Sequence, residues 1–114
     1  MQQLLMVVHK WLWGYNMYNV ELLNTPNQEF SYIVGDKNFR VQLRTIQEKT
    51  FASIFLDGEP LLYSQICTPN NFINLYRYIS VGGKFYFKCV DNEYPNYKKF
   101  GGAHQLLFYT EDEL

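Results

Sequence analysis

The segment EFSYIVGDKNFRVQLRTI, residues 29–46, carries the clearest structural signal in the chain. Its second half places Phe39, Val41 and Leu43 alternately with polar residues, as in a strand that has one face buried and the other in water. Between the two halves, GDKN at 35–38 supplies a turn, because Gly and Asn tolerate positive φ. The segment therefore predicts a β-hairpin that directs these three apolar side chains into a core.

Short runs of the same kind follow along the chain from residue 18 onward. They are rich in β-branched and aromatic residues and are separated by Asn, Asp, Gly and Pro, which is typical of strands joined by turns. At 114 residues, the chain has room for one domain with its own core. We therefore expect an all-β fold, a small single-domain β-barrel or β-sandwich. The expected strands cover residues 18–23, 29–34, 39–46, 50–56, 60–66, 84–90 and 105–110.

The last third of the chain repeats the alternation between buried and exposed positions. Phe85 and Phe87 alternate with lysines and a tyrosine, so this strand is expected to add phenylalanines to the core. A helical turn is expected only in NNFINLYRY, residues 70–78, where Asn71 is a candidate N-cap. The residues assigned to the core are Phe39, Val41, Leu43, Phe85 and Phe87.

A break in composition lies near Met17. We expect residues 17–114 to form the β domain and residues 1–16 to be an N-terminal extension, either an upstream start of the reading frame or an arm that docks on a partner. The apolar run from Leu4 to Val8 has no basic region before it and no small-residue cleavage site after it, so it does not indicate a signal peptide. A bilayer takes about 20 apolar residues to cross, so no membrane insertion is expected.

Reactive side chains are few and scattered. The sequence contains no recognisable nucleophile with its base, paired carboxylates or metal-ligand spacing, so we expect no enzyme, no catalytic residue and no cofactor. His104, Cys67 and Cys89 have atoms that suit zinc, but their spacing matches no zinc motif and the cysteines are expected to be free and buried. VGGK at 81–84 lacks the upstream glycine and the following Ser or Thr of a phosphate-binding loop, and it indicates a turn.

Aromatic residues are numerous in the chain, whereas reactive side chains are few. The chain has 10 tyrosines and 9 phenylalanines, which occur in loops as well as in strands. In DNEYPNYKKFGGAH, residues 91–104, Tyr94, Tyr97 and Phe100 lie among Pro, Gly and Lys. These side chains either cover one end of the domain or form a protein–protein interface, because tyrosine combines a large contact area with a polar tip.

Two ligand-binding alternatives stay open. A single-stranded nucleic acid would stack on aromatic residues and place its phosphates on Arg40, Arg44, Lys84 and Lys88. The formal net charge of −1 disfavours this partner, and no nucleic acid is expected. A carbohydrate held by exposed Tyr and Trp is permitted by the sequence but not favoured by it.

Several phrases along the chain, taken in order, resemble the small baseplate plug proteins of bacteriophages with contractile tails. The resemblance covers residues 17–114. It rests on LLNTPNQEFSYIVGDKNFRVQLR (22–44), LDGEPLLYSQICTPNNFINLYRYISVGGKFYF (56–87) and DNEYPNYKKFGGAHQLLFYTEDEL (91–114). The shared features are a Pro-Asn-Gln-x-Phe start, an Asp-Gly-x-Pro-Leu turn, a Tyr-Arg-Tyr segment before glycine, and a Tyr-x-x-Phe-Gly loop before the last strand.

This resemblance implies a structural part of the tail baseplate, made in the host cytoplasm and carried in the virion in several copies per tail. The implied partners are other baseplate, hub, spike and tail proteins. The resemblance supplies no catalytic residue. Under this interpretation the aromatic clusters are docking surfaces, and the expected interface residues are Tyr76, Arg77, Tyr78, Tyr94, Tyr97 and Phe100.

Overall fold

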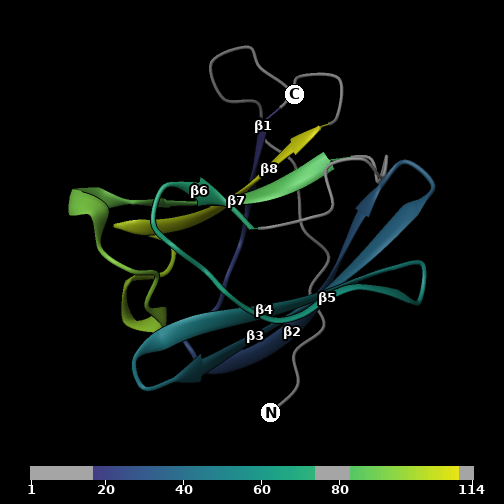
Figure 1. Ribbon diagram of the computed structural model, residues 1–114. Helices are drawn as coiled ribbons and strands as arrows, with labels where there is room; N and C mark the ends of the chain where they lie inside the picture. The colour runs from purple at the N-terminus through teal and green to yellow at the C-terminus, as the bar shows by residue number, and fades with distance from the viewer. Residues whose placement is uncertain (1–16, 74–82, 111–114) are drawn as a thin grey trace.

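Two antiparallel sheets packed face to face make up the part of the chain that the structure, a computed structural model, describes: residues 17–73 and 83–110 (Figure 1). The expected all-β fold is confirmed, and its form is a sandwich. In one sheet, the meander sheet, the strand order is β2-β3-β4-β5. In the other, the β7–β8 sheet, it is β1-β8-β7-β6.

The meander sheet consists of neighbours in sequence joined by tight turns. Its strands are β2 (Asn27–Val34), β3 (Lys37–Ile46), β4 (Lys49–Leu56) and β5 (Glu59–Ile66). Asp57 and Gly58 both have positive φ, as the two central residues of a hairpin turn require, and Asp-Gly is a favoured pair there. Gln47 and Glu48 adopt positive φ as well, although neither is Gly, Asn or Asp, so the β3–β4 turn has a strained backbone.

The β7–β8 sheet combines strands from both ends of the chain. Its strands are β1 (Met17–Val20), β6 (Asn71–Phe72), β7 (Gly83–Cys89) and β8 (His104–Thr110). In the register of β1 with β8, Met17 lies opposite Tyr109 and Val20 opposite Leu106. The last strand therefore lies inside its sheet, between the first strand and β7.

Aromatic rings from both sheets meet in the core. Tyr32 of β2 and Phe39 of β3 contact Phe85 of β7 and Phe108 of β8, with ring centroids 5.0 to 5.9 Å apart. Such tilted and edge-to-face contacts stabilise the core beyond the area they bury. The residues assigned to the core from the alternation are all buried: Phe39, Val41, Leu43, Phe85 and Phe87.

Each of the seven expected strands is present, with shifted ends, and the short β6 is an addition. The largest shift is in the first strand, which was expected to reach residue 23 and ends at Val20. The Gln28 side chain explains this difference, because it accepts a hydrogen bond from the Leu23 N–H at 3.1 Å and donates one to the Leu23 carbonyl at 2.7 Å. The backbone N–H and carbonyl of Leu23 are thus hydrogen-bonded without a neighbouring strand.

The helical turn expected over residues 70–78 falls largely outside the described residues. Its first part, Asn71–Phe72, is strand β6 and pairs with β7. Two short 3₁₀ turns, η1 (Val90–Asn92) and η2 (Tyr97–Lys99), lie instead in the connection from β7 to β8. The N-terminal extension expected over residues 1–16 also lies outside the described residues.

Candidate docking surface

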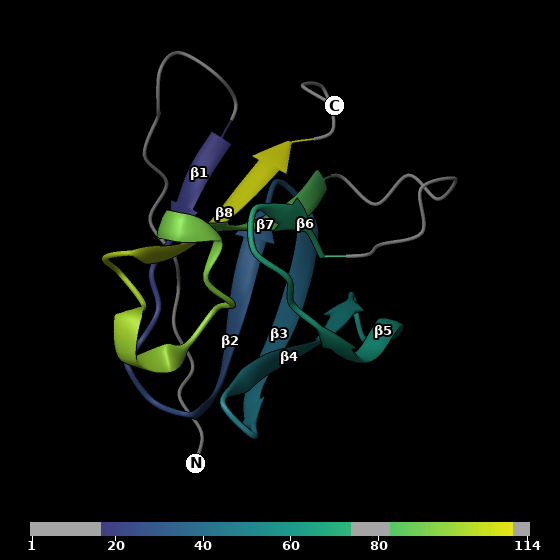
Figure 2. The same ribbon diagram turned by 60° about the vertical axis from the view of Figure 1, so that its left-hand side comes forward.

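The connection from β7 to β8, residues 90–103, forms a compact loop at one end of the sandwich, drawn in yellow-green at the left of Figures 1 and 2. We call it the η1–η2 loop. Asp91 and Asn92 adopt positive φ in η1, a conformation that their side-chain types tolerate. Asn96 caps η2, because its Oδ1 accepts a 3.0 Å hydrogen bond from the Lys98 N–H.

Side chains from β4 and from the connection between β1 and β2 hold the η1–η2 loop from one side. The Thr50 hydroxyl donates a buried 2.8 Å hydrogen bond to the Pro95 carbonyl. Asn24 Nδ2 donates to the carbonyls of Tyr97 and Phe100, at 2.9 and 2.8 Å. Each bond joins residues at least 45 positions apart in the sequence, so the loop is fixed to the sandwich as a whole.

A buried histidine at the start of β8 holds the same loop from the side of the β7–β8 sheet. His104, 1% exposed, accepts a 2.9 Å hydrogen bond at Nδ1 from the Asn96 N–H, and its Nε2 lies 3.1 Å from Glu93 Oε1. The same carboxylate oxygen accepts from Lys99 Nζ at 2.7 Å. The hydrogen bond from Lys99 and then that from His104 lower the pKa of Glu93, so this carboxylate stays charged beside them.

The three aromatic residues of the loop occupy different environments. Phe100 is 5% exposed and its ring stacks on Phe87 with centroids 5.8 Å apart, so it belongs to the core and not to the surface expected from the sequence. Tyr97 is half-buried and packs against the core. Tyr94 is 43% exposed. Tyr76, Arg77 and Tyr78, the other expected interface residues, lie outside the described residues.

Lysines lie over both tyrosine rings of the loop. Lys49 Nζ, from the first residue of β4, is 4.5 Å from the centroid of the Tyr94 ring. Lys98 Nζ is 6.0 Å from the centroid of the Tyr97 ring. The β3–β4 turn also reaches the loop, since Asn96 Nδ2 donates to the Glu48 carbonyl at 3.4 Å. The surface formed here therefore draws on both sheets.

A second group of aromatic rings lies on the outer face of the β7–β8 sheet. Phe72, Tyr86 and Tyr109 contact one another with centroids 5.1 to 5.8 Å apart, and Lys84 Nζ is 5.6 Å from the Phe72 centroid. Partial burial, and then the neighbouring Tyr86, raises the pKa of Tyr109. These rings already pack on one another, and Phe72 is 41% exposed.

The basic residues considered for phosphate binding do not come together. Arg40 and Arg44 alternate with buried residues of β3 and point outward from the meander sheet, where Arg40 Nε pairs with Glu29 Oε2 at 3.3 Å. Lys84 and Lys88 alternate with buried residues of β7 and point outward from the opposite sheet. A single strand of nucleic acid on one face would therefore meet only half of the expected set.

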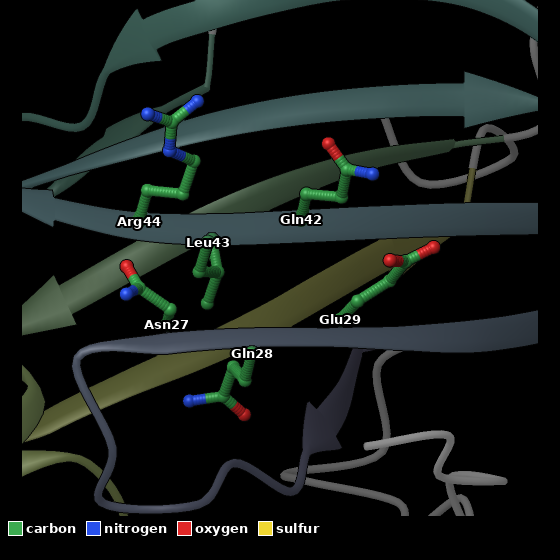
Figure 3. A pocket seen from close by; sticks show the side chains of 6 residues that line it. All are labelled: Asn27, Gln28, Glu29, Gln42, Leu43 and Arg44. Carbon is green, nitrogen blue, oxygen red and sulfur yellow. The ribbon is translucent and has the colours of Figure 1, made fainter. Parts of the chain in front are cut away.

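A pocket of about 250 Å³ opens on β2 and β3 (Figure 3). Asn27, Glu29, Gln42 and Arg44 project from one side of these strands, and Gln28 and Leu43 from the other. The lining contains no histidine, cysteine or hydroxyl side chain. Its carboxylate, Glu29, is already paired with Arg40.

The residues weighed for zinc are engaged within the fold. Both ring nitrogens of His104 contact protein atoms, as given above. Burial raises the pKa of the Cys67 thiol, and burial likewise raises that of Cys89 to about 11, so both are protonated at neutral pH. Among residues 17–73 and 83–110, no group of three His, Cys, Asp or Glu side chains is arranged to hold a metal ion.

Comparison with known proteins gives one family. The family model described as "Cyanophage baseplate Pam3 plug gp18" matches residues 17–112. The search of curated proteins gave no match. Over the described parts of the chain, none of the helices has the length and apolar character needed to traverse a bilayer.

Proposed function

Because the chain belongs to this family of phage baseplate plug proteins, we propose that it is a structural, non-catalytic part of a tail baseplate that acts by docking on neighbouring baseplate proteins. Its partners are hub, spike and tail proteins of the same particle, and its site of action is the tail of the virion. The observation that carries the docking role is the η1–η2 loop, which presents Tyr94 outward while both sheets hold its backbone.

A fixed loop suits docking for a physical reason. Ordering a mobile loop on binding costs free energy, and a loop that is already ordered avoids most of that cost. The bonds from Thr50, Asn24 and His104 provide this order before any partner arrives. Tyrosine is among the residues that most often dominate the binding energy of an interface.

The test uses phage particles made in cells that carry variant forms of the gene. Tyr94→Ser removes the exposed ring and leaves every loop hydrogen bond described above in place. Incorporation of the protein, measured by quantitative mass spectrometry of purified tails, should fall by about tenfold, the ratio that corresponds to 1.4 kcal/mol. Adding Tyr97→Ser should deepen the loss, and the melting midpoint of the purified chain checks that the variants fold.

The matched control is Tyr63→Ser. Tyr63 is 67% exposed on β5, and its ring contacts Phe55 on the same sheet, away from the loop. This variant should be incorporated as the unaltered protein is. Normal incorporation and infectivity of the folded Tyr94→Ser, Tyr97→Ser variant would exclude the loop as the docking surface.

A further inference from the structure

Each tyrosine ring of the η1–η2 loop has the ammonium group of a lysine side chain over it. The ammonium of Lys49 covers one face of the Tyr94 ring at 4.5 Å, and that of Lys98 lies 6.0 Å from the Tyr97 centroid. The two lysines come from different parts of the chain, one from β4 and the other from η2. A partner that covers the tyrosines therefore covers both ammonium groups as well.

Neither lysine has a carboxylate of its own in the described part of the chain. The ion pairs within that part join Arg40 to Glu29 and Lys99 to Glu93, and the same Glu93 oxygen lies 3.1 Å from Nε2 of His104. The Glu93 carboxylate thus contacts Lys99 and His104, and it does not form an ion pair with Lys98. Within the described part of the chain, the partners of the Lys49 and Lys98 ammonium groups are thus the tyrosine rings and not carboxylates.

Docking changes the environment of both ammonium groups. A cation over an exposed aromatic ring gains far less free energy than is lost when an unpaired ammonium is removed from water. An interface that buries Tyr94 must therefore supply a counter-charge to Lys49, or lose much of the affinity that the ring provides. The same reasoning applies to Lys98 over Tyr97.

We propose that the partner of the η1–η2 loop presents carboxylates to Lys49 and Lys98, so that the contacted surface of the neighbouring baseplate protein is acidic. The contact includes the β3–β4 turn, since Ile46, directly opposite Lys49 in the hairpin, is 45% exposed beside it. This inference rests on the proposed docking function and adds the chemistry of the partner to it.

Glu48 provides a way to test whether the partner surface is acidic or basic. It is exposed in the β3–β4 turn next to Lys49, and the turn holds its backbone against Asn96. An acidic partner is repelled by this carboxylate, whereas a basic partner is attracted by it. Replacing Glu48 therefore changes affinity in opposite directions for the two kinds of partner.

The experiment measures how much protein remains in purified tails after washing at low and high salt. Lys49→Glu with Lys98→Glu should reduce incorporation by about 100-fold, within the range for breaking buried charge pairs. Lys49→Met with Lys98→Met keeps the aliphatic stems and should reduce it by about tenfold. Glu48→Gln removes a carboxylate that repels an acidic partner, so more of this variant than of the unaltered protein should be retained in the tails. The wash is at about 0.5 M NaCl, because that salt weakens the attraction that holds the unaltered protein.

The control reverses two lysines elsewhere, with Lys37→Glu at the far end of β3 and Lys88→Glu on the outer face of β7. This variant should be incorporated normally. The proposal that the partner surface is acidic would be contradicted by normal incorporation of the Lys49→Met, Lys98→Met variant. Weaker retention of Glu48→Gln would contradict it as well. The proposed docking function would survive that result as long as Tyr94→Ser still lowers incorporation, so the two failures are distinguishable.

Discussion

The backbone N–H of Asn96 donates a 2.9 Å hydrogen bond to Nδ1 of the buried His104. Because Nδ1 is the acceptor, the neutral imidazole carries its proton on Nε2, directed at Glu93 Oε1 3.1 Å away. One side chain at the start of β8 thus determines the positions of two loop residues that precede it. This arrangement links the core to the candidate docking surface.

Replacing this histidine should loosen the loop. His104→Leu keeps an apolar side chain in the core but leaves the Asn96 N–H without its acceptor, which costs about 1–3 kcal/mol for a buried group. The free energy of unfolding in urea measures this loss, and hydrogen exchange should be faster at the Asn96 amide. Gln105→Leu, at the next and half-buried position, is the control and should change neither quantity by a similar amount. Unchanged exchange at Asn96 would contradict the anchoring role.

Glu93 should contribute to stability at neutral pH and lose this contribution in acid. Lys99 and His104 hold its pKa below the ordinary value in the folded chain. A carboxylate with a lowered folded pKa stabilises the fold above its unfolded pKa, and the contribution disappears as pH falls through the folded value. Glu93→Gln should therefore be less stable than the unaltered chain at pH 7, with the difference shrinking toward about pH 3. A difference independent of pH would argue against the carboxylate's charge as the cause.

Gly83, the first residue of β7, is expected to tolerate no side chain. A Cβ built at this position would overlap the carbonyl oxygen of Tyr109 and the ring of Phe108. Gly83→Ala should lower the free energy of unfolding by about 1–3 kcal/mol, the usual cost of overpacking. Gly102→Ala is the matched control, because its Cβ would come no closer than 3.9 Å to any neighbour. Equal melting midpoints for the two variants would contradict the close approach.

Phe87 should be among the most sensitive core positions. It is fully buried and stacks on Phe100, so that it joins the core to the η1–η2 loop. Phe87→Ala should cost about 3–5 kcal/mol in unfolding free energy. Val90→Ala, at a residue that is 53% exposed, should cost far less. A Phe87→Ala chain that melts with the unaltered one would place the ring outside the core.

The sequence predicted those parts of the fold that depend on local pattern. Alternation at Phe39, Val41 and Leu43 requires only that one face of a strand be buried, and Gly or Asp in turns reports a backbone preference of single residues. These signals sufficed for the all-β class and the expected strands. The order of the phrases along the chain was also enough to identify the family.

Pairings between distant segments left no such mark in the sequence. Nothing in MYNV of β1 indicates that it pairs with a strand almost ninety positions later. The β3–β4 turn was missed as a two-residue turn because Gln47 and Glu48 are not the residues that favour positive φ. In these cases long-range packing determines the structure, and local preference yields to it.

The candidate surface was only partly predictable for the same reason. Tyr94, Tyr97 and Phe100 are alike in composition and spacing, but a loop without periodicity does not tell which ring turns inward. The inward direction of Phe100 follows from its stack on Phe87, and the exposure of Tyr94 from the bonds that hold its neighbours. The residues that hold the loop, buried Thr50 and exposed Asn24, carry no signal in the sequence that distinguishes them from its other polar residues.

The place of β8 between β1 and β7 determines how the chain can acquire its structure during synthesis. Once β5 has left the ribosome, the meander sheet can pair through its short hairpins, but its inner face, with Tyr32 and Phe39, has nothing yet to pack against. The covering sheet lacks β8, one of its two inner strands, until residues 104–110 have been translated. A nascent chain should therefore expose this aromatic surface from the emergence of β2 and β3 until β8 has left the ribosome, and in that interval it should be prone to aggregate or to bind chaperones.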